Sequence, residues 1–364
     1  MQLWNNRFSS FWRPINERLN ALRSLLLGKG APLKIITYRG YGRKDQIFLQ
    51  GRVIKDKFIV VDLTDSKWRN FINSFKRFRS YEIPNAKLDI QVGSHHFEVT
   101  TDGEGYFTLE QRLNPPLPPT EHLWQQAHVQ LKKIPGKKVE VEATGDFILP
   151  TNANFGIISD IDDTIIKTEV TSLLKLRTLY LTILKNAGSR KAFLKVNAFY
   201  QALAKGPAGE GNNPFFYVSN SPWNLYDLLD DFIQINFLPT GPILLRDFGV
   251  TPDKMPDDYL GHKHYSVRKI LKTYPDFPFI LIGDSGEKDA DIYLSVAREF
   301  PEQVAAIYIR DVRSRRRAHR IKQMIEDEPV VNMFLVRNFE EAAEHAIASG
   351  LINQMVFENF KKSG

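Results

Sequence analysis

The sequence predicts an α/β protein with a parallel sheet covered by helices, preceded by a small antiparallel β-sandwich and an N-terminal amphipathic helix. Three observations lead to this prediction. After residue 150, short and nearly continuous apolar runs alternate with helical patterns, as in a buried parallel sheet. From residue 86 to 150, apolar residues recur at every second position, as in half-buried strands. In the first 30 residues, apolar side chains recur at spacings of three and four, as in an amphipathic helix.

Composition excludes several classes of protein. With 364 residues, of which 43% are hydrophobic, the chain can bury a full core and is long enough for two or three domains. No apolar run approaches the roughly 18 residues that a membrane-spanning helix needs. The N-terminus lacks the continuous apolar core of a secretory signal, and the chain has no cysteine. We therefore expect a cytoplasmic protein.

Two segments combine aromatic and basic residues in a helical pattern. The first is the amphipathic basic helix predicted for residues 1–30, and the second is a helix predicted near 66–80, inside a β-sandwich-like domain of residues 31–150. Both helices could pack on the core with their cations in solvent. Both could instead lie on an anionic lipid surface, where each cation contributes roughly 1 kcal/mol. The sequence leaves the two interpretations open.

The parallel-sheet domain is predicted to span residues 151–352. A small cap is expected as an insertion at about 165–213, and residues 353–364 are expected to form a C-terminal tail. A cap of this size leaves the site open, which suits a bulky or membrane-held substrate better than an enclosed metabolite.

Closely spaced aspartates, beginning with Asp160 and Asp162, follow the apolar run FGIIS. Like charges beside a buried strand are costly unless a cation or hydrogen bonds compensate for them. A calcium loop starting at Asp160 is excluded, because Ile165 and Thr171 stand where glycine and glutamate are required. Helix capping by Thr164 or its neighbouring aspartate remains an alternative.

Complementary side chains follow other predicted strands. FFYVSNSPWN ends a strand with Ser219 and Asn220, whose hydroxyl and amide groups can hold an oxyanion. ILIGDSGEKDADIY ends another strand with Asp284 and carries Asp289 shortly after it, while Lys263 stands at the start of a predicted helix. Because ligands bind beyond the carboxyl ends of parallel strands, we expect these residues to form one site.

These signals, in chain order, resemble the four motifs of haloacid-dehalogenase-like (HAD) phosphatases: Asp160-x-Asp162-x-Thr164, Ser219, Lys263, and Asp284 with Asp289. Four segments further resemble the catalytic domain of the phosphatidate phosphatase family related to actin-patch proteins: ISDIDDTI, YVSNSPWN, ILIGDSGEKD and IYIRDV. The likeness runs from about residue 35 to 351. It implies a HAD-like, doubly wound parallel sheet with a small cap.

The resemblance also implies roles for Asp160, Asp162 and Asp284. Asp160 would attack phosphorus and form an aspartyl phosphate, and Asp162 would act as the general acid and then the general base. Mg²⁺ would be bound by Asp160, by the backbone carbonyl of Asp162 and by Asp284.

The remaining residues are expected to support this chemistry. Ser219, Asn220 and Lys263 would bind the phosphate, Asp289 would orient Lys263 or a metal-bound water, and Thr164 would fix the loop. A solvated cation at the start of a helix is the alternative for Lys263. The histidines on either side of Lys263 are expected at the surface or in a supporting position, without a catalytic role.

We therefore expect a magnesium-dependent phosphatase that releases diacylglycerol and phosphate from phosphatidate at the inner face of the membrane. The alternatives are a soluble HAD phosphatase of sugar, nucleotide or nucleic-acid phosphates, and a lipid-binding scaffold without turnover. The basic segment DVRSRRRAHRIK is interpreted as solvated helix surface or as a site for anionic lipid. Because no aromatic residues interleave it, a nucleic-acid partner is not expected. The sequence does not determine the oligomeric state.

Overall fold

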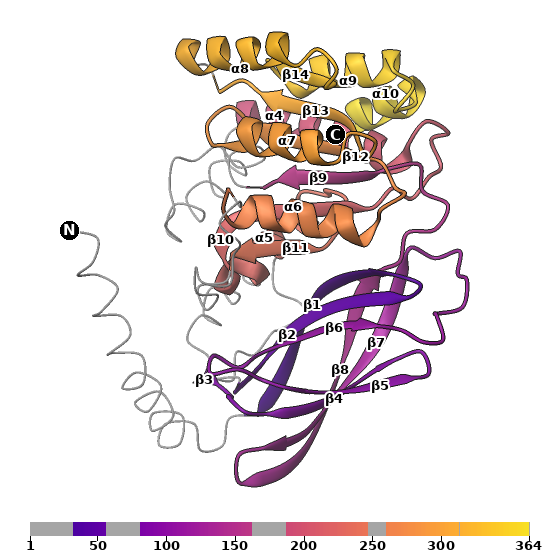
Figure 1. Ribbon diagram of the computed structural model, residues 1–364, viewed down its shortest axis with the longest axis vertical. Coiled ribbons are helices and arrows are strands. Elements are labelled where there is room, and N and C mark those ends of the chain that lie inside the picture. Colours follow the sequence, from indigo (N-terminus) through magenta and orange to yellow (C-terminus); the bar gives the residue numbers. More distant parts are fainter. Residues whose placement is uncertain (1–31, 56–80, 162–186, 247–259, 313, 364) are drawn as a thin grey trace, which may run out of the picture. The chain divides into compact units, whose positions relative to one another are not determined.

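The computed structural model describes residues 32–55, 81–161, 187–246, 260–312 and 314–363 (Figure 1). The described residues form two compact units. The first consists of those up to Pro118 together with Trp124–Phe147, and the second consists of Pro119–Leu123 and those from Ile148 onward. The helices predicted at 1–30 and near 66–80 lie outside the described residues.

The first unit is built on an eight-stranded sheet with the order β3-β2-β1-β8-β7-β4-β5, in which β6 also pairs with β2. Its strands are β1 (Leu33–Arg43), β2 (Gln46–Lys55), β3 (Tyr81–Glu82), β4 (Lys87–Val92), β5 (His95–Thr100), β6 (Tyr106–Arg112), β7 (Trp124–Ile134) and β8 (Lys137–Ile148).

Alternating polarity explains why these segments are strands. In β4, Leu88, Ile90 and Val92 are buried while the residues between them are partly exposed, which confirms the predicted period of two. The strands predicted as a β-sandwich are connected by hydrogen bonds into a single sheet. One continuous sheet forms, because β2 pairs with β1 as well as with β6 and β3, and β8 joins β1 to β7. Strands β1 and β2, which precede the segment where alternation was recognised, supply this connection.

The second unit contains a six-stranded sheet with the order β11-β10-β9-β12-β13-β14. Its strands are β9 (Gly156–Asp160), β10 (Phe215–Pro222), β11 (Ile243–Arg246), β12 (Phe279–Asp284), β13 (Val304–Arg310) and β14 (Met333–Val336). Its helices are α4 (Ala187–Lys205), η2 (Trp223–Leu225), α5 (Tyr226–Ile235), α6 (His262–Thr273), α7 (Asp289–Glu299), α8 (Arg315–Asp327), α9 (Phe339–Ala348) and α10 (Gln354–Ser363). The strand pairs are parallel, which confirms the predicted α/β class.

Helices cover both faces of this sheet. Adjacent residues of a strand point to opposite faces of the sheet. In β10, the ring centroid of Phe215 lies 5.4 Å from that of Tyr200 in α4. The ring centroid of Phe216 lies 5.8 Å from that of Tyr274 at the end of α6. Helices α4 and α6 therefore pack on opposite faces, and α6 and α7 lie in front of the strands in Figure 1. This double cover explains why all residues of β9 and β12 are buried.

The segment predicted as a C-terminal tail is instead largely helical. Helix α10 packs against α4. Its Phe357 side chain is buried, and its Lys361 forms a 3.2 Å ion pair with Glu340 of α9. Apolar burial against α4 stabilises a helix that the short terminal sequence did not indicate. Among the described residues, no helix combines the length and apolar character needed to cross a membrane.

Asn213 joins segments that position the central strand. Its side chain is buried just before β10; Oδ1 accepts a hydrogen bond from the Asn154 amide (2.8 Å), and Nδ2 donates to the Leu203 carbonyl (2.9 Å). One side chain thus ties the end of α4 to the chain that enters β9.

We expect Asn213→Leu to lower the free energy of unfolding by about 1–3 kcal/mol, because it leaves buried backbone groups without partners. Urea denaturation of the full chain measures this change. Asn332→Leu, at an exposed asparagine, is the matched control and should stay within about 0.5 kcal/mol. Equal effects of the two substitutions on the free energy of unfolding would contradict the role of Asn213 in tying α4 to the chain that enters β9.

Candidate active site

Polar side chains meet where the central strands of the parallel sheet end. Asp160 is the last residue of β9 and Asp284 is the last residue of β12. Ile282 of β12 pairs with Ser159 of β9, so the two aspartates lie at the same edge of neighbouring strands. Val218 of β10 pairs with Asp160, which brings the chain that follows Val218 to this edge as well.

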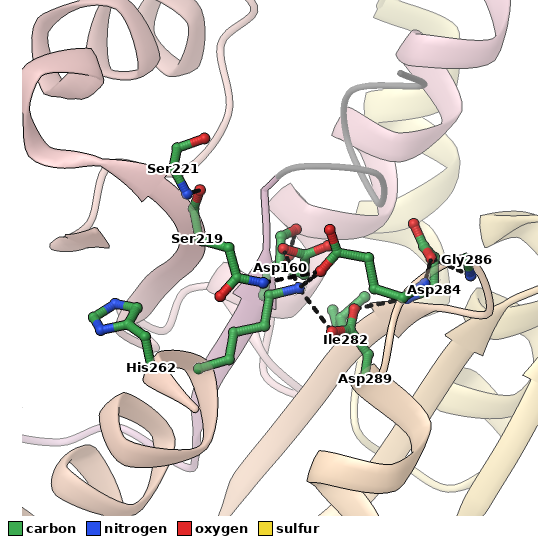
Figure 2. A network of polar contacts seen from close by, with 12 residues as sticks. Asp160, Ser219, Ser221, His262, Ile282, Asp284, Gly286 and Asp289 are labelled. Atoms are coloured by element: carbon green, nitrogen blue, oxygen red, sulfur yellow. Dashed lines mark hydrogen bonds and ion pairs between the residues drawn. The ribbon is translucent and has the colours of Figure 1, made fainter. Parts of the chain in front are cut away.

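Lys263 lies at the centre of the site. It is the second residue of α6, and its side chain is only 1% exposed. Its Nζ lies 3.0 Å from Asp160 Oδ1, 2.7 Å from Asp289 Oδ1 and 2.7 Å from Glu287 Oε2. The carboxylates of Asp160 and Asp289 lie close together around this contact in Figure 2. The alternative of a solvated lysine is therefore wrong.

The electrostatics follow from burial. Burial disfavours the charged form of Lys263, but Asp160 and Asp289 favour it more strongly, so the pKa of Lys263 is raised above its ordinary value. For Asp289, burial and the nearby Asp160 raise the pKa well above the usual range, although Lys263 acts in the opposite direction. Lys263 therefore stays charged, and the carboxyl groups around it lie close to one another.

Hydrogen bonds between its own residues hold the loop from Asp284 to Asp289. Asp284 Oδ1 accepts hydrogen bonds from the amides of Gly286 and Glu287, and Asp289 Oδ2 accepts one from the Asp284 amide at 3.1 Å. A Cβ at Gly283 would lie 2.6 Å from Asp289 Oδ2, so glycine is needed there for the close approach. This network sets the directions of the two aspartate side chains.

Ser219 and Asn220 follow the part of β10 that pairs with β9. Ser219 is fully buried and its Oγ accepts a hydrogen bond from the Ser221 amide at 2.8 Å. Asn220 Nδ2 donates to Glu287 Oε2 at 3.2 Å. Ser219, Asp284 and Asp289 thus gather near Asp160 (Figure 2). Lys263 and Asn220 join them through their hydrogen bonds to Glu287. Asp162 and Thr164 lie outside the described residues.

More negative than positive charge meets at the site. The ion pairs among its described residues join four carboxylates to two cations: Lys263 pairs with Asp160, Glu287 and Asp289, and Arg310 lies 3.9 Å from Asp284. An excess of buried negative charge favours an added cation.

The donor chemistry fits Mg²⁺. Asp160 and Asp284 offer hard carboxylate oxygens, and proteins usually bind Mg²⁺ through one or two carboxylates with water or substrate phosphate completing the shell. In the described part of the chain, no group of three or more acidic or histidine side chains is placed to hold a metal ion. The third expected ligand, at Asp162, lies outside that part.

Two residues of the site were not assigned roles from the sequence. Glu287 bridges Lys263 and Asn220, and Arg310 ends β13 in register with Asp284. The signal for Arg310 was present in IYIRD, since this run is also a predicted strand followed by charged residues. Glu287 had no such signal, because its contact with Lys263 joins two segments that only folding brings together.

The histidines beside Lys263 are not surface residues. His264 is buried and its Nδ1 accepts a hydrogen bond from the Leu260 amide at 3.1 Å. Burial lowers the pKa of His262 to about 4, so this ring is neutral near pH 7. His262 Nε2 lies 3.2 Å from Ser266 Oγ, and His264 Nε2 lies 3.5 Å from Ser295 Oγ.

Lys263→Met should destabilise the protein more at high pH than at low pH. Removing the cation of a buried ion pair costs about 3–5 kcal/mol. Without Lys263 the pKa of Asp289 rises further above its unfolded value, so the stability of the variant is greatest at low pH and falls as pH rises through the folded pKa.

Urea denaturation at about pH 5 and about pH 8 tests this expectation. The difference in unfolding free energy between wild type and Lys263→Met should be larger at the higher pH. Lys272→Met, at an exposed lysine of the same helix, should show a small difference that does not change with pH. A loss of unfolding free energy in Lys263→Met that is the same at both pH values would contradict this expectation.

Comparison with known proteins identifies related sequences. Residues 155–311 match the family model described as "Phosphatidate phosphatase APP1, catalytic domain". The chain is 38% identical over 243 residues to a Saccharomyces cerevisiae protein named phosphatidate phosphatase APP1, covering 64% of this chain and 39% of that protein. It is 29% identical over 219 residues to an uncharacterized protein of Schizosaccharomyces pombe, covering 60% and 35%. The chain thus spans well under half the length of these relatives.

A solved structure gives a much weaker likeness. A carbohydrate acetylesterase from Xanthomonas citri covers 74% of this chain and 65% of its own, at 9% identity and a TM-score of 0.25. So low a score supports no inference about fold or activity.

Proposed function

We propose that this chain hydrolyses phosphatidate to diacylglycerol and phosphate. The premise is the match of residues 155–311 to the catalytic-domain family of phosphatidate phosphatases. The observation that carries the proposal is the buried cluster of Asp160 with Lys263 at the edge of the parallel sheet. A binding scaffold has no need for a fully buried carboxylate beside a buried cation, which is costly to fold.

The proposed reaction has two transfers, as in HAD phosphatases. An oxygen of Asp160 bonds to phosphorus while the bond from phosphorus to the glycerol oxygen breaks, and Asp162 supplies the proton that the leaving oxygen takes up. Water then attacks phosphorus and gives its proton to Asp162, while the bond from phosphorus to Asp160 breaks. Phosphate leaves and both aspartates return to their starting states.

Described residues support the first transfer in three ways. The ion pair with Lys263 fixes the rotation of the Asp160 carboxylate at the strand end. The hydroxyl of Ser219, the amide of Asn220 and the ammonium of Lys263 would bind the phosphate oxygens as negative charge redistributes. Because the Asp160 side chain is fully buried, bulk water is kept from it.

Asp160 and Asp284 would hold Mg²⁺. When bound, this ion would offset the repulsion between an anionic nucleophile and an anionic phosphate.

The first turn of α8 supports a place at an anionic membrane surface. Arg315, Arg316 and Arg317 are exposed there, and cations at a helix N-terminus are unfavourable to the helix dipole. An anionic partner would offset that cost. Helix α8 begins shortly after Arg310, which ends its strand beside Asp284, so this basic turn follows the edge of the sheet that carries the site.

Asp160→Asn should reduce phosphate release from phosphatidate in mixed micelles with Mg²⁺ to below about one thousandth of wild type, because the nucleophile is lost. Asp327→Asn, at an exposed aspartate of α8, is the matched control and should retain activity. Equal release by Asp160→Asn would remove Asp160 from its role. Release from soluble phosphomonoesters but not from phosphatidate would favour the soluble phosphatase, and no release from either would favour the scaffold.

Replacing Arg315, Arg316 and Arg317 with alanine should weaken sedimentation with phosphatidate-containing vesicles about 100-fold, at roughly 1 kcal/mol for each cation. Vesicles of neutral lipid should bind neither protein well. As a control, alanines at the exposed Lys132, Lys133 and Lys137 of the first unit remove the same charge. Equal losses in both triple variants would show that only net charge matters.

A further inference from the structure

Glu287 accepts hydrogen bonds from two groups to which the proposed function assigns phosphate binding. Lys263 Nζ lies 2.7 Å from Glu287 Oε2, and Asn220 Nδ2 lies 3.2 Å from the same oxygen. The two donors come from different elements, the start of α6 and the end of β10. Their convergence on one carboxylate oxygen marks a point where an anionic oxygen is bound.

Two donors of Lys263 are already engaged, in hydrogen bonds to Glu287 Oε2 and Asp289 Oδ1. An ammonium group has three N–H donors. Three carboxylate oxygens, from Asp160, Glu287 and Asp289, lie within 3.0 Å of Nζ. An incoming phosphate oxygen can therefore bind Lys263 closely only if one of these carboxylates moves away.

The surroundings of the three carboxylates identify the one that can move. Asp160 and Asp289 have fully buried side chains, and Asp289 is also held by the Asp284 amide. Glu287 is 30% exposed and has a longer side chain on the loop between β12 and α7. Moving Glu287 into solvent costs less than moving either aspartate, because a partly exposed carboxylate is readily rehydrated.

We propose that Glu287 is a placeholder for phosphate, which rests on the phosphate-binding role proposed above. In the unliganded protein its carboxylate holds Lys263 and Asn220 in position by occupying the place of a phosphate oxygen. A phosphate group displaces it, and Glu287 then turns toward solvent. Glu287 thus opposes binding of the phosphate and is not required for the chemical step.

Isothermal titration calorimetry of the protein with inorganic phosphate tests the placeholder. Glu287→Ala should bind phosphate at least about tenfold more tightly than wild type, because no carboxylate competes for the charge-assisted hydrogen bonds. Glu287→Gln, which keeps the length but loses the charge, should lie between the two. In turnover, both variants should lower KM without raising kcat.

The control variant is Glu302→Gln, at an exposed glutamate, and its phosphate affinity should equal that of wild type. Weaker or unchanged phosphate binding by a folded Glu287→Ala protein would overturn the proposal, as would absence of phosphate binding by all the proteins. Hydrolysis of phosphatidate by wild type separately tests the proposed function. Tighter phosphate binding by Glu287→Ala without any phosphatidate hydrolysis would support the placeholder and overturn the lipid substrate.

Discussion

The site depends on one buried cation. Lys263 carries a charge that burial disfavours, and it keeps that charge because Asp160 and Asp289 lie within 3.0 Å. The dependence is mutual, since the two aspartates are fully buried and would be costly to ionise without the lysine. One ion cluster therefore joins the end of β9 to the starts of α6 and α7, and it sets the geometry from which the proposed chemistry proceeds.

The parallel sheet makes that cluster possible. Strand β9 lies between β10 and β12, so three strand ends that are far apart in the sequence reach one edge. Helices on both faces exclude water from the strands, as the contacts of Phe215 with Tyr200 and of Phe216 with Tyr274 show. Low solvent access strengthens each electrostatic contact at the edge and raises the cost of any carboxylate left without compensation.

The loop after β12 combines fixed and movable acids within a few residues. Asp284 and Asp289 are held by backbone amides of the loop itself, and the absence of a side chain at Gly283 lets the chain pack this tightly. Glu287 is instead bonded to two side chains, those of Lys263 and Asn220, and is 30% exposed. The proposed function would use the two kinds of carboxylate differently, the fixed ones to hold a cation and the partly exposed one to exchange with phosphate.

The sequence by itself determined the parallel-sheet class and most of the candidate site, because apolar runs ending in Asp160, Ser219 and Asp284 reveal strand ends locally. Contacts between distant segments were decided only by the tertiary structure. Glu287, on the loop after β12, meets Lys263 at the start of α6 and Asn220 at the end of β10. Strands β1 and β2 join the strands of the first unit into one hydrogen-bonded sheet. The physical reason is that periodicity records which side of an element is buried, whereas partners depend on how the chain returns to the same place.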